Sequence, residues 1–298
     1  MKYKDTLTMN ITKTSMNTHT PPHGLTPLPP DSRDFSLGGA YRLPPLEELP
    51  EVYHSPAPKH IKDQKNSDFC TQYAFCAASE WQEEVLLEPS YTFALAKFIQ
   101  KSPASWGCDL RSAAKAHVEY GAIEEAKSPY SIRNKDVQWL RYLRNWPVDL
   151  AEDAKEHKKE SYMAVTGQHE TAFDNIRAAI YAFKDQKKLP VIGVEWSWPN
   201  SQKVMNLPGD RSPMGHAVLV RGWHKDYLII QNSYGPRVGD GGLHHIHKDL
   251  INRFVGRYGA FMLTDAPRTE AEKAIENNHY LNDEWWRRLW LFIINLFK

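Results

Sequence analysis

The stretch that decides the fold is residues 215–235, which reads GHAVLVRGWHKDYLIIQNSYG. Its two apolar runs, 216–223 and 226–233, are rich in β-branched and aromatic residues, as buried strands are. The short polar segment between them favours a tight turn, and therefore an antiparallel pair. His216 begins the first run and Asn232 lies near the end of the second. Antiparallel pairing would bring these two polar side chains together at one end of the pair.

Helical patterns dominate the first half of the chain and strand patterns the second. Apolar residues recur at spacings of three and four in the helical segments. We expect helices over 70–87, 90–101, 109–120 and 172–186, with two more helical pieces in 135–165. We expect further strands over 190–196, 243–248 and 258–263. Runs of helices followed by runs of strands indicate an α+β protein with segregated halves.

The composition is that of an ordinary globular protein. The chain has 298 residues, of which 41% are hydrophobic and 24% charged, and its formal net charge is +1. This balance does not predict a nucleic-acid partner. The N-terminus lacks the apolar stretch of a secretory signal, and no segment has the ~20 apolar residues of a membrane-spanning helix. We therefore expect a cytoplasmic or virion-associated protein with no transmembrane span.

Three regions differ in character. Residues 1–30 belong to a proline-rich stretch, and we expect them to be flexible. Residues 31–265 form the folded domain, beginning with an extended arm over 31–60. Residues 266–298 form a helical tail whose end, EWWRRLWLFIINLFK, carries an amphipathic aromatic stripe. We expect this stripe to dock on a protein partner or on a membrane surface.

Cys70 stands at the start of the first strong helix, after the polar segment KDQKNSDF. A thiol at a helix N-terminus lies near unpaired backbone N–H groups and the positive end of the helix dipole, which favour the thiolate. Gln64 lies six residues upstream, where its amide is able to donate to an oxyanion beside the Cys70 N–H. Nucleophile, base, orienting amide and oxyanion donor are thus represented by Cys70, His216, Asn232 and Gln64.

These motifs resemble the papain-like cysteine peptidases. Residues 61–74, IKDQKNSDFCTQYA, resemble the family's segment in which a glutamine precedes the active cysteine by six residues. Residues 215–223 and 227–242 are similar to its histidine strand and to its asparagine strand with the glycine-rich turn that follows. The Cys-Thr form resembles the bacterial and phage-type branch. The resemblance covers roughly 30–265.

The resemblance implies a two-lobed fold, with a helical lobe, an antiparallel β-barrel-like lobe and a cleft between them. It implies an endopeptidase that hydrolyses extended polypeptides, with catalytic residues Cys70, His216, Asn232 and Gln64 and with no cofactor or metal. Ser67 stands where the family often has a cysteine, so Cys108 is expected to be free. The helical inhibitory propeptide typical of the family has no counterpart in the proline-rich residues 1–58.

Two other functions remain open. An acyl transferase or amidase would use the same triad, and a catalytically degenerate module would serve a structural or interaction role, for example in a virus particle. His244, His245 and His247 suggest a metal site, but they lack a cysteine or carboxylate at ligand spacing. We expect them to lie on a solvated strand.

Overall fold

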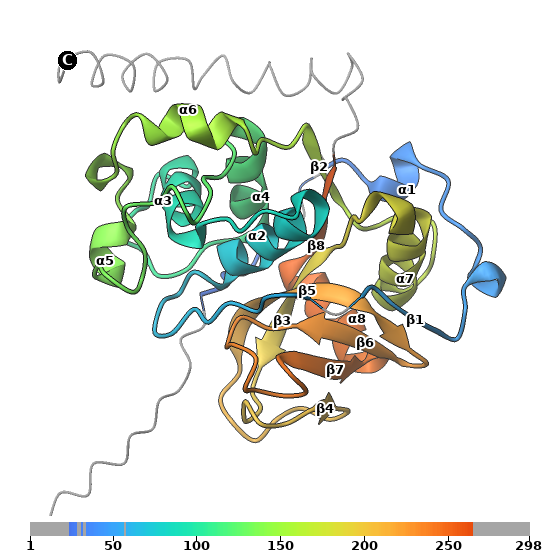
Figure 1. Ribbon diagram of the computed structural model, residues 1–298. Helices are drawn as coiled ribbons and strands as arrows, with labels where there is room; N and C mark the ends of the chain where they lie inside the picture. The colour runs from blue at the N-terminus through green and yellow to red at the C-terminus, as the bar shows by residue number, and fades with distance from the viewer. Residues whose placement is uncertain (1–23, 29–30, 32–33, 57, 265–298) are drawn as a thin grey trace, which may run out of the picture.

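The computed structural model describes residues 24–28, 31, 34–56 and 58–264 (Figure 1). The tail over 266–298 and most of the N-terminal segment expected to be flexible lie outside these residues. Residues 24–28 belong to that segment, and here Leu25 and Leu28 are buried against the domain. Among the described residues, no helix combines the length and the apolar character needed to cross a bilayer.

The helical lobe is built from three main helices, α2 (Cys70–Glu83), α3 (Pro89–Ile99) and α4 (Leu110–Glu119). Side chains cap two of them: Glu88 accepts from the Ser90 N–H at the start of α3, and Asp109 accepts from the Ser112 N–H at the start of α4. Helix α2 ends four residues earlier than expected, because Glu84 takes a left-handed conformation and donates its N–H to Glu80.

The second lobe is one mostly antiparallel sheet in the order β2-β8-β3-β5-β6-β7-β4, with β1 also paired to β5. Among the strands of the described residues, only β4 pairs in parallel, with β7. The strands are β1 (Val52–His54), β2 (Ser161–Ala164), β3 (Val191–Trp196), β4 (Val204–Met205), β5 (Met214–His224), β6 (Tyr227–Gln231), β7 (Leu243–His247) and β8 (Ala260–Thr264). The expected α+β class is confirmed.

The remaining helices are short or lie beside the sheet. They are α1 (Leu37–Ala40), α5 (Val137–Leu140), α6 (Leu150–Lys155), α7 (Ala172–Ala182) and α8 (Lys248–Tyr258), with 3-10 turns at Leu46–Glu48, Leu143–Asn145 and Lys184–Gln186. Sequence patterns missed α8, β2 and the two-residue strand β4. Helix α8 carries Leu250, Phe254 and Tyr258 four residues apart, which is a helical stripe. Strand β2 has four residues, all buried, so it shows no alternation.

Helix α2 joins the two lobes. It packs against α3 and α4 on one side and against β5 on the other, as Figure 1 shows. Its residues Cys70, Phe75 and Ala78 are fully buried and belong to one hydrophobic core that continues into β3, β5 and β8. The start of α2 is therefore held beside the sheet, near the beginning of β5, where His216 lies.

Candidate active site

Cys70 is the first residue of α2, and its side chain is fully buried. The first N–H groups of a helix have no intrahelical partners, so they face this end. Three backbone N–H groups act on the sulfur, those of Ala217, Gly24 and Thr71. Ala217 follows His216 on β5. The structure thus brings Cys70 from the helical lobe next to the histidine strand of the sheet lobe.

His216 and Asn232 are in direct contact. His216 Nε2 lies 2.8 Å from Asn232 Oδ1, which also accepts the Ser233 N–H at 2.7 Å. An amide oxygen only accepts hydrogen bonds, so His216 Nε2 carries the hydrogen. In the neutral imidazole, Nδ1 is then the basic nitrogen. The contact arises as expected from the β5–β6 pairing, in which Leu219 lies opposite Gln231.

A second histidine lies behind the asparagine. His244 Nδ1 donates to the Gln202 carbonyl oxygen at 2.7 Å, and His244 Nε2 lies 3.4 Å from Asn232 Nδ2. Burial lowers the pKa of His244 to about 4, so the ring is neutral near pH 7 and Nε2 accepts from the Asn232 amide. The expectation that His244 lies on a solvated strand is wrong, since it is fully buried. Its neighbours His245 and His247 are partly exposed, because they point to the other face of β7.

Aromatic rings enclose the two histidines. Tyr234 stacks on His216 with ring centroids 4.9 Å apart, and its phenol oxygen lies 3.4 Å from His216 Nδ1. Trp196 on β3 meets His216 edge-on at 5.5 Å and His244 at 5.0 Å. Sequence patterns placed Trp196 only at the end of the strand expected over 190–196. Its contact with the imidazoles depends on β3 pairing with β5, where Val194 lies opposite His216.

Gln64 lies in the loop that leads into α2, and it is fully buried. Its Nε2 donates to the Ser67 carbonyl oxygen at 2.8 Å, and its Oε1 accepts from the Ser233 hydroxyl at 2.5 Å. The Gln64 N–H also donates to the Ser233 carbonyl at 2.8 Å. The glutamine is therefore anchored to the residue that follows Asn232. All four side chains singled out in the sequence lie in this region.

The protonation state of Cys70 differs from the sequence expectation. Complete burial raises the pKa of the Cys70 thiol to about 12, although backbone N–H groups act in the opposite direction. The sulfur is thus a thiol near neutral pH in this conformation. Desolvation outweighs the helix N-terminus because the chain itself covers the site.

The cover is the segment of residues 24–28. Leu25 N–H donates to the Gly215 carbonyl at 3.0 Å, next to His216. On the other side, Cys108 N–H donates to the Gly24 carbonyl at 2.7 Å, and Thr26 N–H donates to the Cys108 carbonyl at 3.1 Å. The segment pairs in parallel with Cys108. An extended piece of chain therefore lies between the two lobes, over Cys70.

This segment fits closely against the domain. A Cβ on Gly24 would lie 1.8 Å from the Asp68 carbonyl oxygen, so only glycine fits there. The Leu25 side chain is 6% exposed. It fits beside Gly193, where a Cβ would lie 2.6 Å from Leu25 Cδ2 and 2.2 Å from Tyr258 Cβ. The domain thus provides an apolar site for one branched side chain of an extended peptide.

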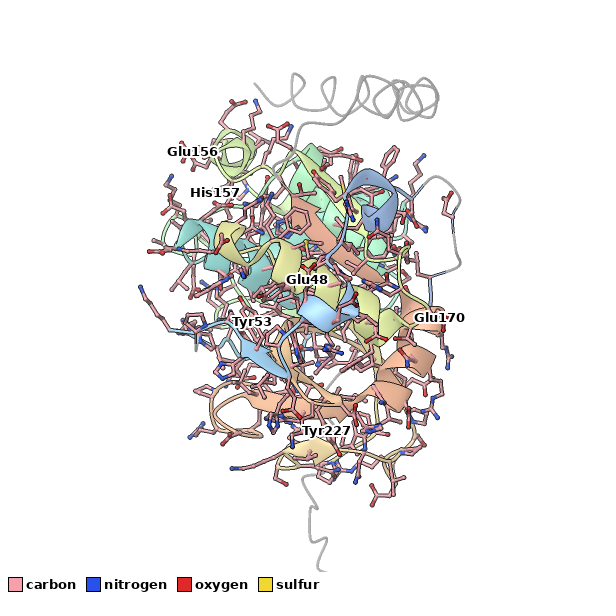
Figure 2. The ribbon with its side chains drawn as sticks, turned by 90° about the vertical axis from the view of Figure 1, so that its right-hand side faces the viewer. Glu48, Tyr53, Glu156, His157, Glu170 and Tyr227 are labelled. Carbon is pink, nitrogen blue, oxygen red and sulfur yellow. The ribbon has the colours of Figure 1, made fainter. Side chains whose placement is uncertain are left out.

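One group of described residues could hold a metal ion, namely Glu124, Glu156 and His157. Figure 2 shows Glu156 and His157 on the helical lobe, far from Tyr227 of the sheet. Lys127 Nζ already lies 2.9 Å from Glu124 Oε1 and 3.1 Å from Glu156 Oε2. The single lysine thus bridges the two carboxylates, so the cluster is explained without a metal.

Solved structures share this architecture. Xylellain, a cysteine protease from Xylella fastidiosa, matches with a TM-score of 0.69 and 21% identity, over 82% of this chain and 96% of its own. The chain has a papain-like fold. Procathepsin B from Trypanosoma congolense matches with a TM-score of 0.56 and 18% identity, over 82% of this chain and 87% of its own.

A third match is the Carica candamarcensis cysteine protease CMS1MS2, solved in complex with E-64. Its TM-score is 0.51 and its identity 17%, over 73% of this chain and 100% of its own. No family model matches the chain, and no curated protein matches its sequence. The likeness is therefore one of fold, at a sequence identity too low to transfer an activity.

Proposed function

We propose that this protein is a cysteine-type endopeptidase, with Cys70 as nucleophile, His216 as general base and acid, and Asn232 as the residue that orients the imidazole. The observation that carries this proposal is the His216–Asn232 hydrogen bond of 2.8 Å beside the start of the helix that bears Cys70. The bond leaves Nδ1 as the basic nitrogen of the imidazole. The papain-like fold and the cysteine proteases that share it support the same function.

The proposed reaction would use only side-chain and backbone groups of this chain and water. His216 Nδ1 takes the Cys70 proton as the sulfur attacks the scissile carbonyl, forming a tetrahedral oxyanion. The Cys70 N–H and the Gln64 amide donate to that oxyanion. The imidazolium then protonates the leaving amine, and the neutral ring activates a water molecule that releases the acyl group. None of these steps calls for a metal or another cofactor.

The substrate would be an extended polypeptide. The backbone groups of Gly215 and Cys108 already pair with an extended stretch, residues 24–26, which supports main-chain recognition. We assign the peptidase domain to residues 31–265. The Cys-Thr form at Cys70 further supports a bacterial or phage-type member of the family.

Labelling with an epoxide-type thiol probe, together with a peptide-hydrolysis assay, tests the proposal. We expect mass spectrometry to find the label on Cys70, and Cys70→Ala to lose both the label and hydrolysis. Cys76→Ala is the matched control, because Cys76 is equally buried on the same helix. It should keep both.

The alternatives give different results. Labelling without hydrolysis, but with transfer of the acyl group to an added amine, would indicate an acyl transferase. If neither wild type nor Gly24→Ala, in which the added Cβ displaces the segment that covers Cys70, hydrolyses peptide, and the probe does not distinguish them from Cys70→Ala, the degenerate-module alternative holds and the peptidase proposal is wrong.

A further inference from the structure

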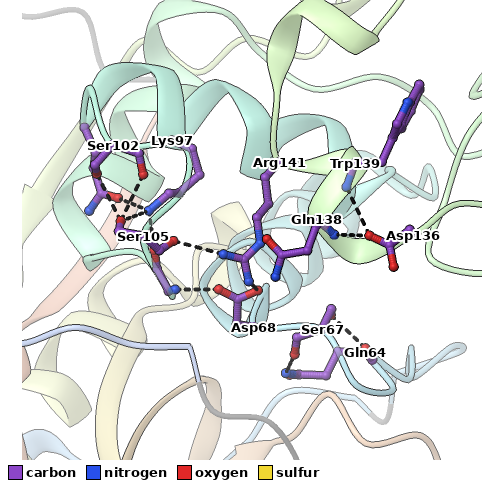
Figure 3. Close-up of polar contacts among 12 residues, drawn as sticks. Gln64, Ser67, Asp68, Lys97, Ser102, Ser105, Asp136, Gln138, Trp139 and Arg141 are labelled. Carbon is purple, nitrogen blue, oxygen red and sulfur yellow. Dashed lines mark hydrogen bonds and ion pairs between the residues drawn. The ribbon is translucent and has the colours of Figure 1, made fainter.

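Charged side chains are buried behind the main chain that pairs with residues 24–26. Asp68 Oδ1 and Arg141 Nη2 are 2.5 Å apart, and the two side chains are 0% and 1% exposed. Figure 3 shows this pair between the loop before α2 and the loop that follows α3. Lys97 on α3 is also buried and lies nearby. Three charges thus meet in the interior of the helical lobe.

All three groups hold the loop that ends in Gly107 and Cys108. The second Asp68 oxygen accepts the Gly107 N–H at 2.5 Å. Lys97 Nζ donates to the Gly107 carbonyl at 2.8 Å and to the Ser105 hydroxyl at 2.6 Å. Arg141 Nη1 donates to the Ser105 carbonyl at 3.0 Å. Both polar groups of the Gly107 backbone are therefore fixed by buried charges.

Stability alone is a weak reason for such an arrangement. Burial raises the pKa of Asp68 and lowers that of Lys97, so desolvation opposes both charges. Buried ion pairs often stabilise a fold no better than apolar residues of similar size. What charges add is geometric specificity, because bonds to a carboxylate and a guanidinium fix direction as well as distance.

The direction of these bonds matters because they join the start of the helix that bears Cys70 to the backbone that precedes Cys108. Asp68 is two residues before Cys70, so one carboxylate joins the start of the nucleophile's helix to Gly107. Cys108 follows Gly107, and its N–H and carbonyl both pair with an extended stretch of chain. The separation between Cys70 and this peptide-pairing edge is thus determined through Asp68.

We propose that Asp68, Arg141 and Lys97 are positioning residues, which hold the backbone of Gly107 and Cys108 at the distance from Cys70 that a bound polypeptide needs. A substrate pairs with Cys108 while its scissile carbonyl reaches the sulfur. Small errors in such an alignment slow a reaction strongly. This inference rests on the proposed peptidase function and names the groups that set its peptide-binding geometry.

The test compares two reagents that alkylate Cys70 in the full-length chain with Gly24→Ala, because residues 24–26 otherwise occupy the Cys108 edge and cover the sulfur. This chain is the parent of every variant below. Iodoacetamide reports only the access and reactivity of the sulfur, whereas a peptidyl epoxide must also pair with the edge. In Arg141→Gln we expect the peptidyl epoxide to react about tenfold more slowly, a loss equivalent to roughly one main-chain hydrogen bond. We expect the iodoacetamide rate to stay within about threefold of the parent, so the ratio of the two rates falls.

Three further variants separate positioning from folding. Lys97→Met releases the Gly107 carbonyl but leaves the Asp68–Arg141 pair intact, and it should lower the ratio less. Asp68→Asn with Arg141→Gln removes both charges and should unfold at a higher temperature than Arg141→Gln alone, because no charge stays unpaired. In this double variant, the ratio of the peptidyl epoxide rate to the iodoacetamide rate should remain low. Arg144→Gln changes an exposed arginine that stacks on Tyr142 and should behave as the parent.

Two results would overturn the inference. In the first, Lys97→Met and the double variant fold but keep the parent's ratio. In the second, both reagents slow by the same factor, which indicates a general loss of structure. Failure of the proposed function looks different: the parent itself would then show no faster reaction with the peptidyl epoxide than with an epoxide that lacks the peptide.

Discussion

Replacing Gly24 by alanine should open the candidate active site. The alanine Cβ would lie 1.8 Å from the Asp68 carbonyl oxygen. That oxygen belongs to the backbone, so it cannot rotate away as the end of a side chain could. Residue 24 must therefore move, and the hydrogen bonds that hold residues 24–26 over Cys70 are lost with it. The change adds one methyl group and leaves the proposed catalytic residues as they are.

The size of the effect follows from the free energy that residues 24–28 gain when they pack over Cys70. Leu25 and Leu28 are at most 9% exposed. Burying each contributes about 2 kcal/mol. The four main-chain bonds made by Leu25, Thr26, Leu28 and Cys108 contribute about 1 kcal/mol each. Ordering the segment costs about 1 kcal/mol per residue. The net preference for the closed state is then about 3 kcal/mol, or on the order of 100-fold.

The assay is the rate of Cys70 alkylation by iodoacetamide at pH 7.5, followed by mass spectrometry. In the closed state the sulfur is buried and its pKa is about 12, so it should react very slowly. Gly24→Ala should react up to about 100-fold faster. Solvent also lowers the pKa of the exposed thiol, so the rate should rise at a lower pH than in wild type.

Gly256→Ala is the matched control, because a Cβ there meets nothing within 4 Å. It should react at the wild-type rate. The reasoning would be refuted if Gly24→Ala folds and still reacts within twofold of Gly256→Ala. Residues 24–28 would then not control access to Cys70.

Three other predictions concern the histidines and their partners. Asn232→Ala should lower kcat for peptide hydrolysis about 100-fold with a small change in KM, because the imidazole loses its orientation; an equal loss in Gln231→Ala would contradict this role. His244→Leu should lower kcat about tenfold, because the Asn232 amide loses its acceptor, and His244→Gln, which keeps an acceptor, should recover part of that loss. A positioning role for His244 is excluded if His244→Gln recovers none of the loss or if His244→Leu keeps the wild-type kcat. Burial lowers the pKa of His117 to about 3 and that of His244 to about 4, so both rings are neutral in the folded chain and charge on unfolding. Their contribution to stability is fully present above pH ~6.5 and is lost as the pH falls, by about 1.4 kcal/mol per pH unit for each ring down to its folded pKa. Urea unfolding from pH 7 to 4 measures this slope, which His117→Gln should reduce by about half.

Local sequence patterns predicted much of the candidate active site. The two apolar runs around a short polar turn predicted β5 and β6, and the antiparallel pairing brought His216 to Asn232 as expected. The spacing of Gln64 and Cys70 identified the loop and helix that meet this pair. These features were readable because hydrogen-bond pairing and helix periodicity act between neighbours in the chain or across one turn.

Other features depend on residues that are distant in sequence. His244 lies beside Asn232 because β7 pairs with β6, yet a row of three histidines in the sequence predicted only a solvated strand. Asp68 and Arg141 are separated by 73 positions, and neither belongs to a motif. No periodicity predicts such a contact, since it forms only when the end of α5, which is followed by Arg141, comes beside the loop before α2.

The sequence by itself determined most of the longer helices and strands, the α+β class and the candidate residues Cys70, His216, Asn232 and Gln64, because each rests on local spacing. Only the tertiary structure decided the state of the nucleophile. The helix start alone favours a thiolate, but residues 24–28 fold back over Cys70 and remove its water, which raises its pKa to about 12. Solvation is a property of the assembled chain, and no stretch of sequence specifies it alone.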